Sequence, residues 1–346
     1  MLKRKFTLGC DIASLTIACS VLETPEKMIL KPKEFANNFA GFEQCMRWLK
    51  SSSIKAKEVL VCMEHTGVYS ESFCYYLYDH DIKVVIESGA KIKKSFKLAT
   101  HKTDAIDSIA IAEYAIRYAD HLNAWEPRHS AVEAVKSLIT SRELFVKHQT
   151  AQKNALSAYK RKVVQNELIR KEYENSIQHL DQTIKNLENE IESTLKQNEY
   201  WLAVIKIIKT AKGADKLLSY NIFVLSNAFS MKLDYKKLAA YLRICPYQHS
   251  SGTSIKKKAK SPKYGPRIMK KLLFLAARSA CQYDPNLKAY YARKKSEGKC
   301  YFVIMNNIAN KLLKLICAMI NSGKPYIQNY RSVNPILVKK YLFWSW

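Results

Sequence analysis

The chain has 346 residues, enough for two domains, and 48% of them are hydrophobic, which is ample for packed cores. It has 57 Lys or Arg against 30 Asp or Glu, a formal net charge of +27. The excess is uneven, because residues 201–346 contain 28 basic and only four acidic side chains, whereas residues 1–200 are nearly balanced. A uniformly lysine-rich surface is therefore disfavoured, and the second half is expected to bind polyanions by neutralising phosphates.

The nine cysteines form no Cys-x-x-Cys pair, and several, such as Cys62 and Cys317, lie inside apolar runs. Cysteine in such a setting behaves as a small hydrophobic residue. The pattern argues against a disulfide or zinc framework and indicates a reducing, cytoplasmic compartment. Asp11 interrupts the apolar stretch after the basic N-terminus, so we expect no secretory signal. No run of 18 uncharged apolar residues occurs, so we expect no membrane span.

The first part of the chain predicts a sheet layered with helices. Residues 5–12 alternate apolar with small or polar side chains, which is the period of a strand, and residues 16–23 and 27–35 predict two more strands. The later elements follow in chain order: a helix over 39–49, a strand over 58–64, a helix over 68–80, a strand over 82–88 and a basic helix from about residue 90. This order predicts an α/β fold for residues 1–125.

The middle of the chain, residues 126–200, is almost wholly helix-forming, with no Gly or Pro over 130–200. Apolar residues recur there at steps of four and three, as in a coiled-coil seam: Tyr173, Ile177, Leu180, Ile184, Leu187 and Ile191. Because fewer than three heptads are present, one amphipathic helix that packs on its own domain is the alternative. We favour a helical hairpin that separates two domains or mediates dimerisation.

Residues 201–346 predict a second, mostly helical and basic domain. Residues 237–247 predict a helix broken at Pro246, and 268–282 and 302–320 predict the longest helices. Between these helices lies a basic segment without acids, which we expect to form a loop. Its candidate phosphate contacts are Lys256, Lys257, Lys258, Lys260, Lys263, Arg267, Lys270 and Lys271, and Tyr247 and Tyr264 are the aromatic residues that could stack on bases. The alternative is that these side chains contact only water, on a solvated loop and helix face that binds no phosphate.

Carboxylates mark the ends of the predicted strands. Asp11 ends the first strand after Gly9, whose missing side chain would let a ligand approach closely. Glu64 ends the strand over 58–64, and Asp104 and Asp107 lie three residues apart at a helix start, hence on one face. Ligands bind at this edge of an α/β sheet.

Four converging carboxylates would repel one another unless a divalent cation offset their charge. Oxygen-only ligands favour Mg²⁺ or Mn²⁺, and two such ions can stabilise both the attacking and the leaving oxygen of a phosphoryl transfer. The acids at the helix start are also explained by the helix dipole. Asp11, an acid in an otherwise apolar strand, needs a partner. The order of first strand, fourth strand and late helix is that of a ribonuclease-H-like nuclease.

The stretches GCDIAS, MEHTGVY and HKTDAIDS together resemble the DEDD motif of RuvC-like transposases from bacterial insertion sequences. The stretch LAAYLRICPYQHSSGTSIKKKAKSPKYGPRIMKKLL resembles the C-terminal signature of that family, although Arg243 or Ile244 stands in place of its usual glycine. The resemblance spans nearly the whole chain. It implies a RuvC-like catalytic domain over 1–125, a coiled-coil-like segment over 126–200 and a basic transposase domain over 201–346.

The resemblance also implies a mechanism. An element-encoded bridge RNA would pair with donor and target DNA while the protein exchanges strands. Two Mg²⁺ or Mn²⁺ ions would be bound by Asp11, Glu64, Asp104 and Asp107. Ser251 would attack a phosphodiester and form a phosphoserine, with Ser250 and Ser254 as alternatives; a serine hydroxyl needs activation of this kind.

A homodimer or tetramer without membrane contact is expected. Two other functions are weighed against this one. A RuvC-like metal-dependent nuclease would cut branched DNA by water attack and leave no protein attached. A non-catalytic protein that binds DNA or RNA would use the basic surface alone, but it would have no use for four ordered carboxylates.

Overall fold

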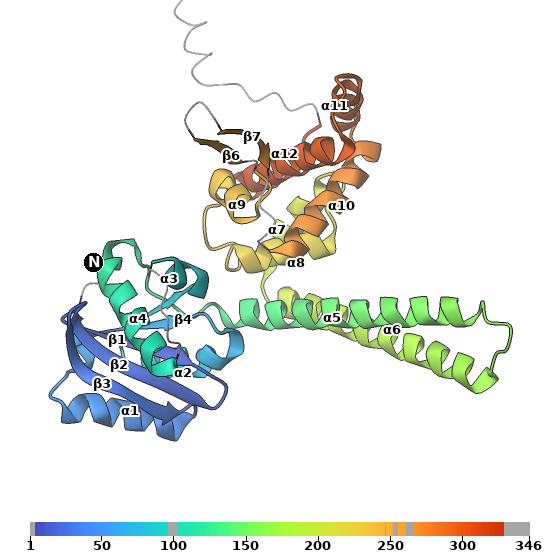
Figure 1. The fold of residues 1–346 in the computed structure, drawn as a ribbon. Coiled ribbons are helices and arrows are strands. Elements are labelled where there is room, and N and C mark those ends of the chain that lie inside the picture. The colour runs from blue at the N-terminus through green and yellow to red at the C-terminus, as the bar shows by residue number, and fades with distance from the viewer. Residues whose placement is uncertain (1–3, 96–102, 246, 252–254, 261–265, 329–346) are drawn as a thin grey trace, which may run out of the picture. The chain divides into compact units, whose positions relative to one another are not determined.

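The computed structural model describes residues 4–95, 103–245, 247–251, 255–260 and 266–328, with only the backbone described for 247–251 and 255–260. The chain divides into two compact units, Met1–Pro127 and Arg128–Trp346. Figure 1 shows the sheet in the first unit and the helices that make up most of the second. The predicted combination of an α/β part and a mostly helical remainder is confirmed.

The first unit is built on a five-stranded mixed sheet with β1 (Phe6–Ile12) at its centre. On one side β2 (Thr16–Thr24) pairs antiparallel with β1, and β3 (Lys27–Ala36) pairs antiparallel with β2. On the other side β4 (Val59–Glu64) and β5 (Lys83–Glu87) add in parallel. All five strands occur where the sequence predicts them, and the C-terminal ends of β1, β4 and β5 share one edge of the sheet.

Helices cover both faces of this sheet (Figure 1). On one face α1 (Phe39–Ser51) and α2 (Glu71–Asp79) contribute Phe42 and Phe73 to a core that includes Leu8 and Cys10 of β1. On the other face α4 (Asp104–Arg117) packs its apolar side on β4 and β5. The remaining helical elements are short: α3 (Gly89–Ser95) and the 3₁₀ turns η1 (Ala56–Glu58), η2 (Gly67–Ser70) and η3 (Ala119–His121).

Gly9 brings α4 into close contact with β1. A Cβ atom at this position would lie 2.1 Å from the carbonyl oxygen of Ser108 and 2.6 Å from the backbone nitrogen of Ala112. The expectation that Gly9 leaves room for a ligand was therefore wrong. The missing side chain instead makes room for the backbone of α4, which occupies this face of the strand.

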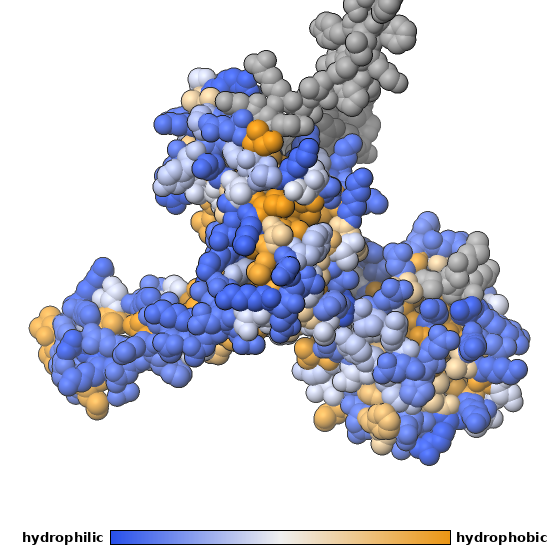
Figure 2. All heavy atoms as spheres, turned by 180° about the vertical axis from the view of Figure 1, so that it is seen from behind, coloured by the Kyte–Doolittle hydropathy of each residue, from blue (hydrophilic) through white to orange (hydrophobic). Residues whose placement is uncertain are grey.

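The second unit begins with the hairpin of α5 (Ser130–Tyr159) and α6 (Glu167–Lys196). This confirms the predicted helical hairpin, with Ile184 and Ile191 of the expected seam buried. At the closed end the loop valines Val163 and Val164 are exposed, and hydrophobic residues are visible at the tip of the hairpin in Figure 2. A role of the hairpin in dimerisation stays a prediction.

The open end of the hairpin shares a hydrophobic core with the helices that follow it. Val132 and Val135 of α5 and Leu195 of α6 belong to the same buried cluster as Leu273 and Ile308 farther along the chain. The structure thus groups residues 128–200 with the C-terminal part in one compact unit, whereas the sequence predicts a separate middle segment. The functional roles assigned to the three segments stay predictions.

Within its described residues, the second unit has six further helices: α7 (Glu199–Thr210), α8 (Lys216–Leu225), α9 (Tyr235–Tyr241), α10 (Arg267–Tyr283), α11 (Pro285–Ser296) and α12 (Tyr301–Ser322). In the described part of the chain, α12 is the one helix long and apolar enough to cross a membrane. However, 56% of its most apolar window is buried inside the unit, where α12 packs against α10. This burial is typical of the core helix of a globular unit.

Two predictions between α9 and α10 need correction. The helix expected over 237–247 ends at Tyr241, because Arg243 takes a left-handed conformation with φ of 54°. The backbone N–H groups of Arg243 and Ile244 then donate to the carbonyl oxygens of Ala240 and Ala239, the pattern of a Schellman turn. Glycine is the usual residue at this position of the turn, which agrees with the glycine that the family signature places there.

The basic segment that follows also differs from its predicted structure. Instead of a loop, β6 (Tyr247–Ser251) and β7 (Ile255–Lys260) pair as an antiparallel hairpin. The sequence IKKKAK lacks the apolar alternation that reveals a half-buried strand, so periodicity could not predict β7. Its strand conformation rests on backbone pairing with β6.

The contact at Gly9 predicts a large local cost for a small substitution. In Gly9→Ala the added methyl group must displace the backbone of α4, so we expect the first unit to lose about 2 kcal/mol or more of unfolding free energy. Leu15→Ala is the matched control, because Leu15 is 80% exposed in the turn after β1 and should change stability by less than about 0.5 kcal/mol. Chemical denaturation monitors both, and equal stability of the two variants would contradict the proposed packing.

Candidate active site

Asp11 and Glu64 lie next to each other at the edge where the parallel strands end. In the ladder between β1 and β4, Gly9 pairs with Cys62 and Cys10 with Met63. Because side chains alternate along a strand, Asp11 and Glu64 point to the same face as Gly9 and Cys62, which is the face covered by α4. Both residues are half-buried.

Asp104 and Asp107 stand in the first turn of α4, above the same edge. Thr103 fixes the start of the helix, since its Oγ1 accepts a hydrogen bond of 3.3 Å from the backbone N–H of Ile106. Asp104 is exposed and Asp107 is half-buried. The close packing of α4 on Gly9 fixes the distance of both residues from Asp11, which lies two residues farther along β1.

The four carboxylates interact through their charges. Burial raises the pKa of Asp11 to about 6, and the neighbouring charges of Asp104, Asp107 and Glu64 act in the same direction. A hydrogen bond with the Ile12 backbone opposes this rise of the Asp11 pKa but does not offset it. The structure therefore brings together the four acids that the sequence singled out, in a place where negative charge is already unfavourable.

The chemistry of these donors fits a hard divalent cation, because all four are carboxylates and oxygen ligands suit Mg²⁺ or Mn²⁺. Their positions are more widely spaced than a bound ion requires. Across the described ranges, no group of three or more His, Cys, Asp or Glu side chains is gathered tightly enough to hold a metal ion. The four acids therefore fit a hard cation by their chemistry, and binding would bring their side chains closer together.

Glu87 is a fifth carboxylate at the same edge, and the sequence analysis missed it. It pairs with Glu64 in the ladder between β4 and β5, and its side chain is 14% exposed. It accepts hydrogen bonds from the Ser88 backbone at 2.8 Å, from Lys91 Nζ at 3.0 Å and from Tyr114 Oη at 3.2 Å. Burial and the charge of Glu87 together raise the pKa of Tyr114 to about 12.

Through these hydrogen bonds Glu87 has a structural role, since it holds two helices against the sheet. Lys91 belongs to α3 and Tyr114 to α4, so one carboxylate ties both helices to the end of β5. A sequence signal was present, because IKVVIES ends a predicted strand with Glu in the same way as VLVCME.

Gly89 restricts the position of the Glu64 carboxylate. It is the first residue of α3, and a Cβ atom there would lie 1.8 Å from Oε1 of Glu64. Any side chain at this position would push the carboxylate away from its present place. Glycines at two positions, 9 and 89, thus fit the helices closely around the acidic edge.

The candidate nucleophiles lie in the second unit. Ser251 is the last residue of β6 and stands opposite Ile255, while Ser250 stands opposite Lys256 and His249 opposite Lys257. Lys258 and Lys260 also belong to β7. Three candidates, Ser254, Lys263 and Tyr264, lie outside the described residues.

Both ends of this strand hairpin are attached to helices. Before it, the Arg243 carbonyl oxygen accepts a hydrogen bond of 3.3 Å from Lys270 Nζ, and the Ile244 carbonyl accepts one of 2.8 Å from Asn306. After it, α10 begins at Arg267, which is exposed. Lys271 lies 3.6 Å from the carboxylate of Glu143 in α5. Of the predicted phosphate contacts, Lys270 and Lys271 therefore also have partners within the protein.

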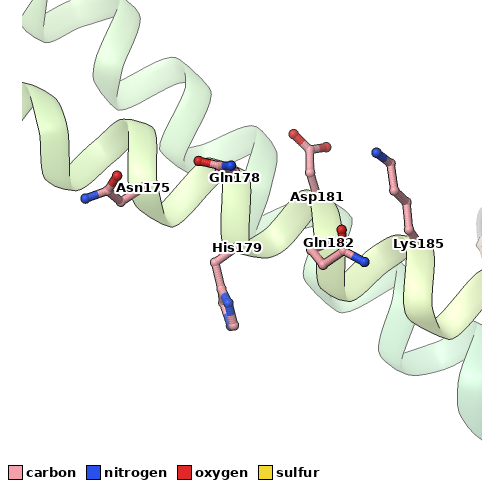
Figure 3. A pocket seen from close by; sticks show the side chains of 6 residues that line it. All are labelled: Asn175, Gln178, His179, Asp181, Gln182 and Lys185. Atoms are coloured by element: carbon pink, nitrogen blue, oxygen red, sulfur yellow. The ribbon is translucent and has the colours of Figure 1, made fainter.

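An open polar hollow lies along α6, far in sequence from both the four carboxylates and the candidate serines (Figure 3). The side chains that line it are Asn175, Gln178, His179, Asp181, Gln182 and Lys185. All belong to one exposed helix face, and Asp181 accepts a hydrogen bond from Gln149 of α5. Small-molecule sites are usually concave and lined mainly by apolar side chains, and this open, polar helix face lacks such a lining. The contact between the two helices accounts for Asp181 without a ligand.

The raised pKa of Asp11 predicts a pH-dependent gain in stability for Asp11→Asn. The pKa of Asp11 is about 6 when folded, above its ordinary 3.8, so its ionisation increasingly opposes folding as the pH rises through this window. Without divalent ions, the advantage of Asp11→Asn over the unsubstituted protein should grow between about pH 4 and pH 7, by roughly 1 kcal/mol after solvent screening, and then level off. Thermal unfolding checks this, with the exposed Asp120→Asn as control; parallel pH curves would contradict it.

Two family models match the chain, one over the residues with the four carboxylates and one over the residues with the candidate serines. Residues 8–163, which contain the four carboxylates, match a transposase model of the DEDD type of IS110. Residues 205–292, which contain the serines and the basic hairpin, match the transposase IS116/IS110/IS902 family.

Curated proteins similar to the chain include the pilin gene-inverting proteins of Moraxella lacunata and Moraxella bovis. Each is 26% identical over 332 residues, which cover 93% of this chain and 98% of the relative. The insertion element IS110 uncharacterized 43.6 kDa protein of Streptomyces coelicolor is 33% identical over 89 residues, covering 26% of this chain and 22% of that protein.

Among solved structures, Thermus thermophilus RuvC in complex with a Holliday junction substrate is 9% identical with a TM-score of 0.27, covering 35% of this chain and 99% of that one. The two family matches lie in the order that the DEDD motif and the C-terminal signature require, and together they contain every candidate site residue. The chain belongs to the IS110 family of DEDD transposases.

Proposed function

We propose that this protein is a DNA transposase or recombinase that cuts and rejoins DNA by metal-assisted attack of Ser251 on a phosphodiester. The observation that carries the proposal is the convergence of Glu64, Asp104 and Asp107 on Asp11, whose pKa is raised by burial and, in addition, by the charges of these three acids. Such a cluster of acids can bind divalent cations, which in turn contact the phosphate oxygens of a substrate. Relatives named for inverting a pilin gene support a reaction that rearranges DNA.

In this mechanism the four carboxylates would hold Mg²⁺ or Mn²⁺. When bound, the ions supply electrostatic stabilisation of the attacking and leaving oxygens. The Ser251 hydroxyl oxygen would form a bond to phosphorus and lose its proton, while the bond from phosphorus to a bridging deoxyribose oxygen breaks and that oxygen takes up a proton to become a hydroxyl. The resulting phosphoserine keeps a phosphodiester linkage, so attack by a second DNA hydroxyl can rejoin the strands.

The basic second unit would hold the nucleic acid during these steps. Its candidate contacts stand beside the serines, because β7 pairs Lys256 and Lys257 with the residues just before Ser251. Guidance by an element-encoded RNA is part of the proposal and rests on the family resemblance. Assembly as a dimer or tetramer rests on the hairpin of α5 and α6.

A metal-dependent nuclease that uses water is the second candidate. It is favoured by the placement of all four carboxylates in the first unit, away in sequence from the serines. Without a covalent intermediate it would release cut DNA that carries no protein, and this difference separates the two functions.

We predict that Ser251→Ala and Asp11→Asn each reduce strand exchange by roughly 10³-fold or more, because each removes a group that acts only in the reaction. Nucleic-acid binding should remain. Denaturing gels of labelled, nicked DNA show the covalent adduct directly. Ser250→Ala is the matched control and should form the adduct normally.

The outcomes of this assay distinguish the candidates. If Ser251→Ala cuts DNA at a normal rate and the unsubstituted protein forms no adduct, the nuclease function replaces the proposed one. Loss of the adduct in Ser250→Ala or Ser254→Ala, but not in Ser251→Ala, moves the nucleophile to that residue.

Phosphate binding by β7 predicts a measurable change in salt dependence. Replacing Lys256, Lys257 and Lys258 with Gln should lower the log–log slope of affinity against salt by about 0.7–0.9 for each phosphate that the variant no longer neutralises. The control replaces three exposed lysines of α6, Lys171, Lys185 and Lys196, and should leave the slope nearly unchanged. Fluorescence anisotropy measures both, and equal slopes in the two triple variants would remove β7 from the binding surface.

A further inference from the structure

Aromatic rings gather on the second unit where α10 meets the start of α12. The ring of Phe274 stacks with that of Phe302 at a centroid distance of 6.0 Å and lies 6.2 Å from Tyr301. Tyr291 of α11 lies 6.4 Å from Tyr301. We call these four residues the aromatic surface.

Packing within the unit accounts for Phe274 and Tyr291, which are partly buried against its core, but not for Tyr301 and Phe302. Phe302 is 69% exposed and Tyr301 is 41% exposed, although the next residues of α12, from Ile304, are buried. Leu275 and Val303 beside them are each 49% exposed. Single exposed hydrophobic residues are common, but neighbouring ones mark a surface that another molecule covers.

Cations lie close in sequence to this surface, and three of them contact Tyr290, the neighbour of Tyr291. Arg278 lies one turn after Phe274 on α10, and Lys299 comes just before α12; both are exposed. The ring of Tyr290 has Lys311 at 4.8 Å, Arg293 at 5.5 Å and Lys294 at 6.0 Å. Arg293 and Lys294 already pair with Glu297, and Lys299 also interacts with its charge, so one carboxylate faces three cations. A polyanion would neutralise the excess positive charge, whereas an apolar partner surface would not.

The surface also continues from the basic hairpin along one helix face. Arg267, Lys271, Phe274 and Arg278 follow one another at steps of four, three and four, so they lie on one side of α10. The first of these residues follows closely on the segment that contains β6 and β7. A strand bound along the hairpin could therefore continue along α10 to the aromatic rings.

We propose that the aromatic surface binds an unpaired DNA strand, with bases stacked on Phe302 and Tyr301 and phosphates contacted by Arg278 and Lys299. Base faces are hidden inside a duplex and accessible in a single strand, and stacking on aromatic rings between cations is how proteins hold single strands. The inference rests on the proposed function in taking DNA as the substrate, since strand exchange exposes unpaired bases. It does not depend on which group is the nucleophile.

The test is binding of the full chain to a labelled oligothymidine of about 20 nucleotides and to a duplex of the same length. Phe302→Ala should weaken oligothymidine binding by roughly 5- to 100-fold, as expected when one base no longer stacks. Binding to the duplex and the salt dependence should stay nearly unchanged, because the variant keeps every cation that binds phosphate. Phe39→Ala is the matched control, since Phe39 is 65% exposed in the first unit.

Two further variants separate stacking from a simple apolar contact. Phe302→Trp retains a flat ring and should bind the oligomer like the unsubstituted protein. Phe302→Leu retains only apolar bulk and should bind as weakly as Phe302→Ala. Normal binding by Phe302→Leu would overturn the proposal.

Two other results would overturn the proposal that the aromatic surface binds an unpaired DNA strand. If Phe302→Ala abolishes self-association in sedimentation experiments while oligothymidine binding is unchanged, the surface is a contact between protein chains and the proposal fails. Weakening confined to an RNA oligomer of matching sequence would overturn the assignment to DNA. The adduct assay with nicked DNA is a separate readout, so failure of the proposed reaction is distinguished from failure of base stacking on Phe302.

Discussion

The close approach of the α4 backbone to Gly9 is the contact on which the acidic edge depends. Asp104 and Asp107 come to Asp11 only because α4 rests directly on β1, with backbone atoms where a side chain would otherwise stand. No change of rotamer can relieve a contact between two backbones. The hydrogen bond from Tyr114 to Glu87 holds the same helix farther along its length. The spacing of the acids is therefore a property of how one helix sits on one sheet.

The acids at this edge differ in how their charge is compensated. Glu87 and Glu64 end neighbouring strands and pair in register, yet Glu87 has Lys91, Tyr114 and a backbone N–H as partners. Asp11 instead lies among other acids, and burial together with their charges raises its pKa to about 6. A carboxylate whose charge the protein already offsets supports the structure. One whose charge is left unfavourable is prepared for a cation or a proton.

Much of the first unit could be predicted from sequence, because alternation and apolar runs reveal strands, and acids stand out where such strands end. Glu87 obeys the same rule as Glu64, but only the parallel register shows that the two are neighbours. For Gly9, the sequence cannot tell whether a missing side chain admits a ligand or a helix. In the second unit, β7 forms through backbone pairing that leaves no apolar pattern, and the left-handed turn at Arg243 is occupied by a residue that does not favour it.

The distribution of thiols has a practical consequence. All nine cysteines lie in the described ranges; six are buried, two are half-buried, and Cys300 alone is exposed. Burial raises the pKa of Cys62, Cys74 and Cys317 to about 12, so these groups remain unreactive thiols near neutral pH. Cys300 directly precedes Tyr301 at the start of α12. The unaltered chain thus carries its own attachment point for a fluorophore or crosslinker, at the border of the aromatic surface.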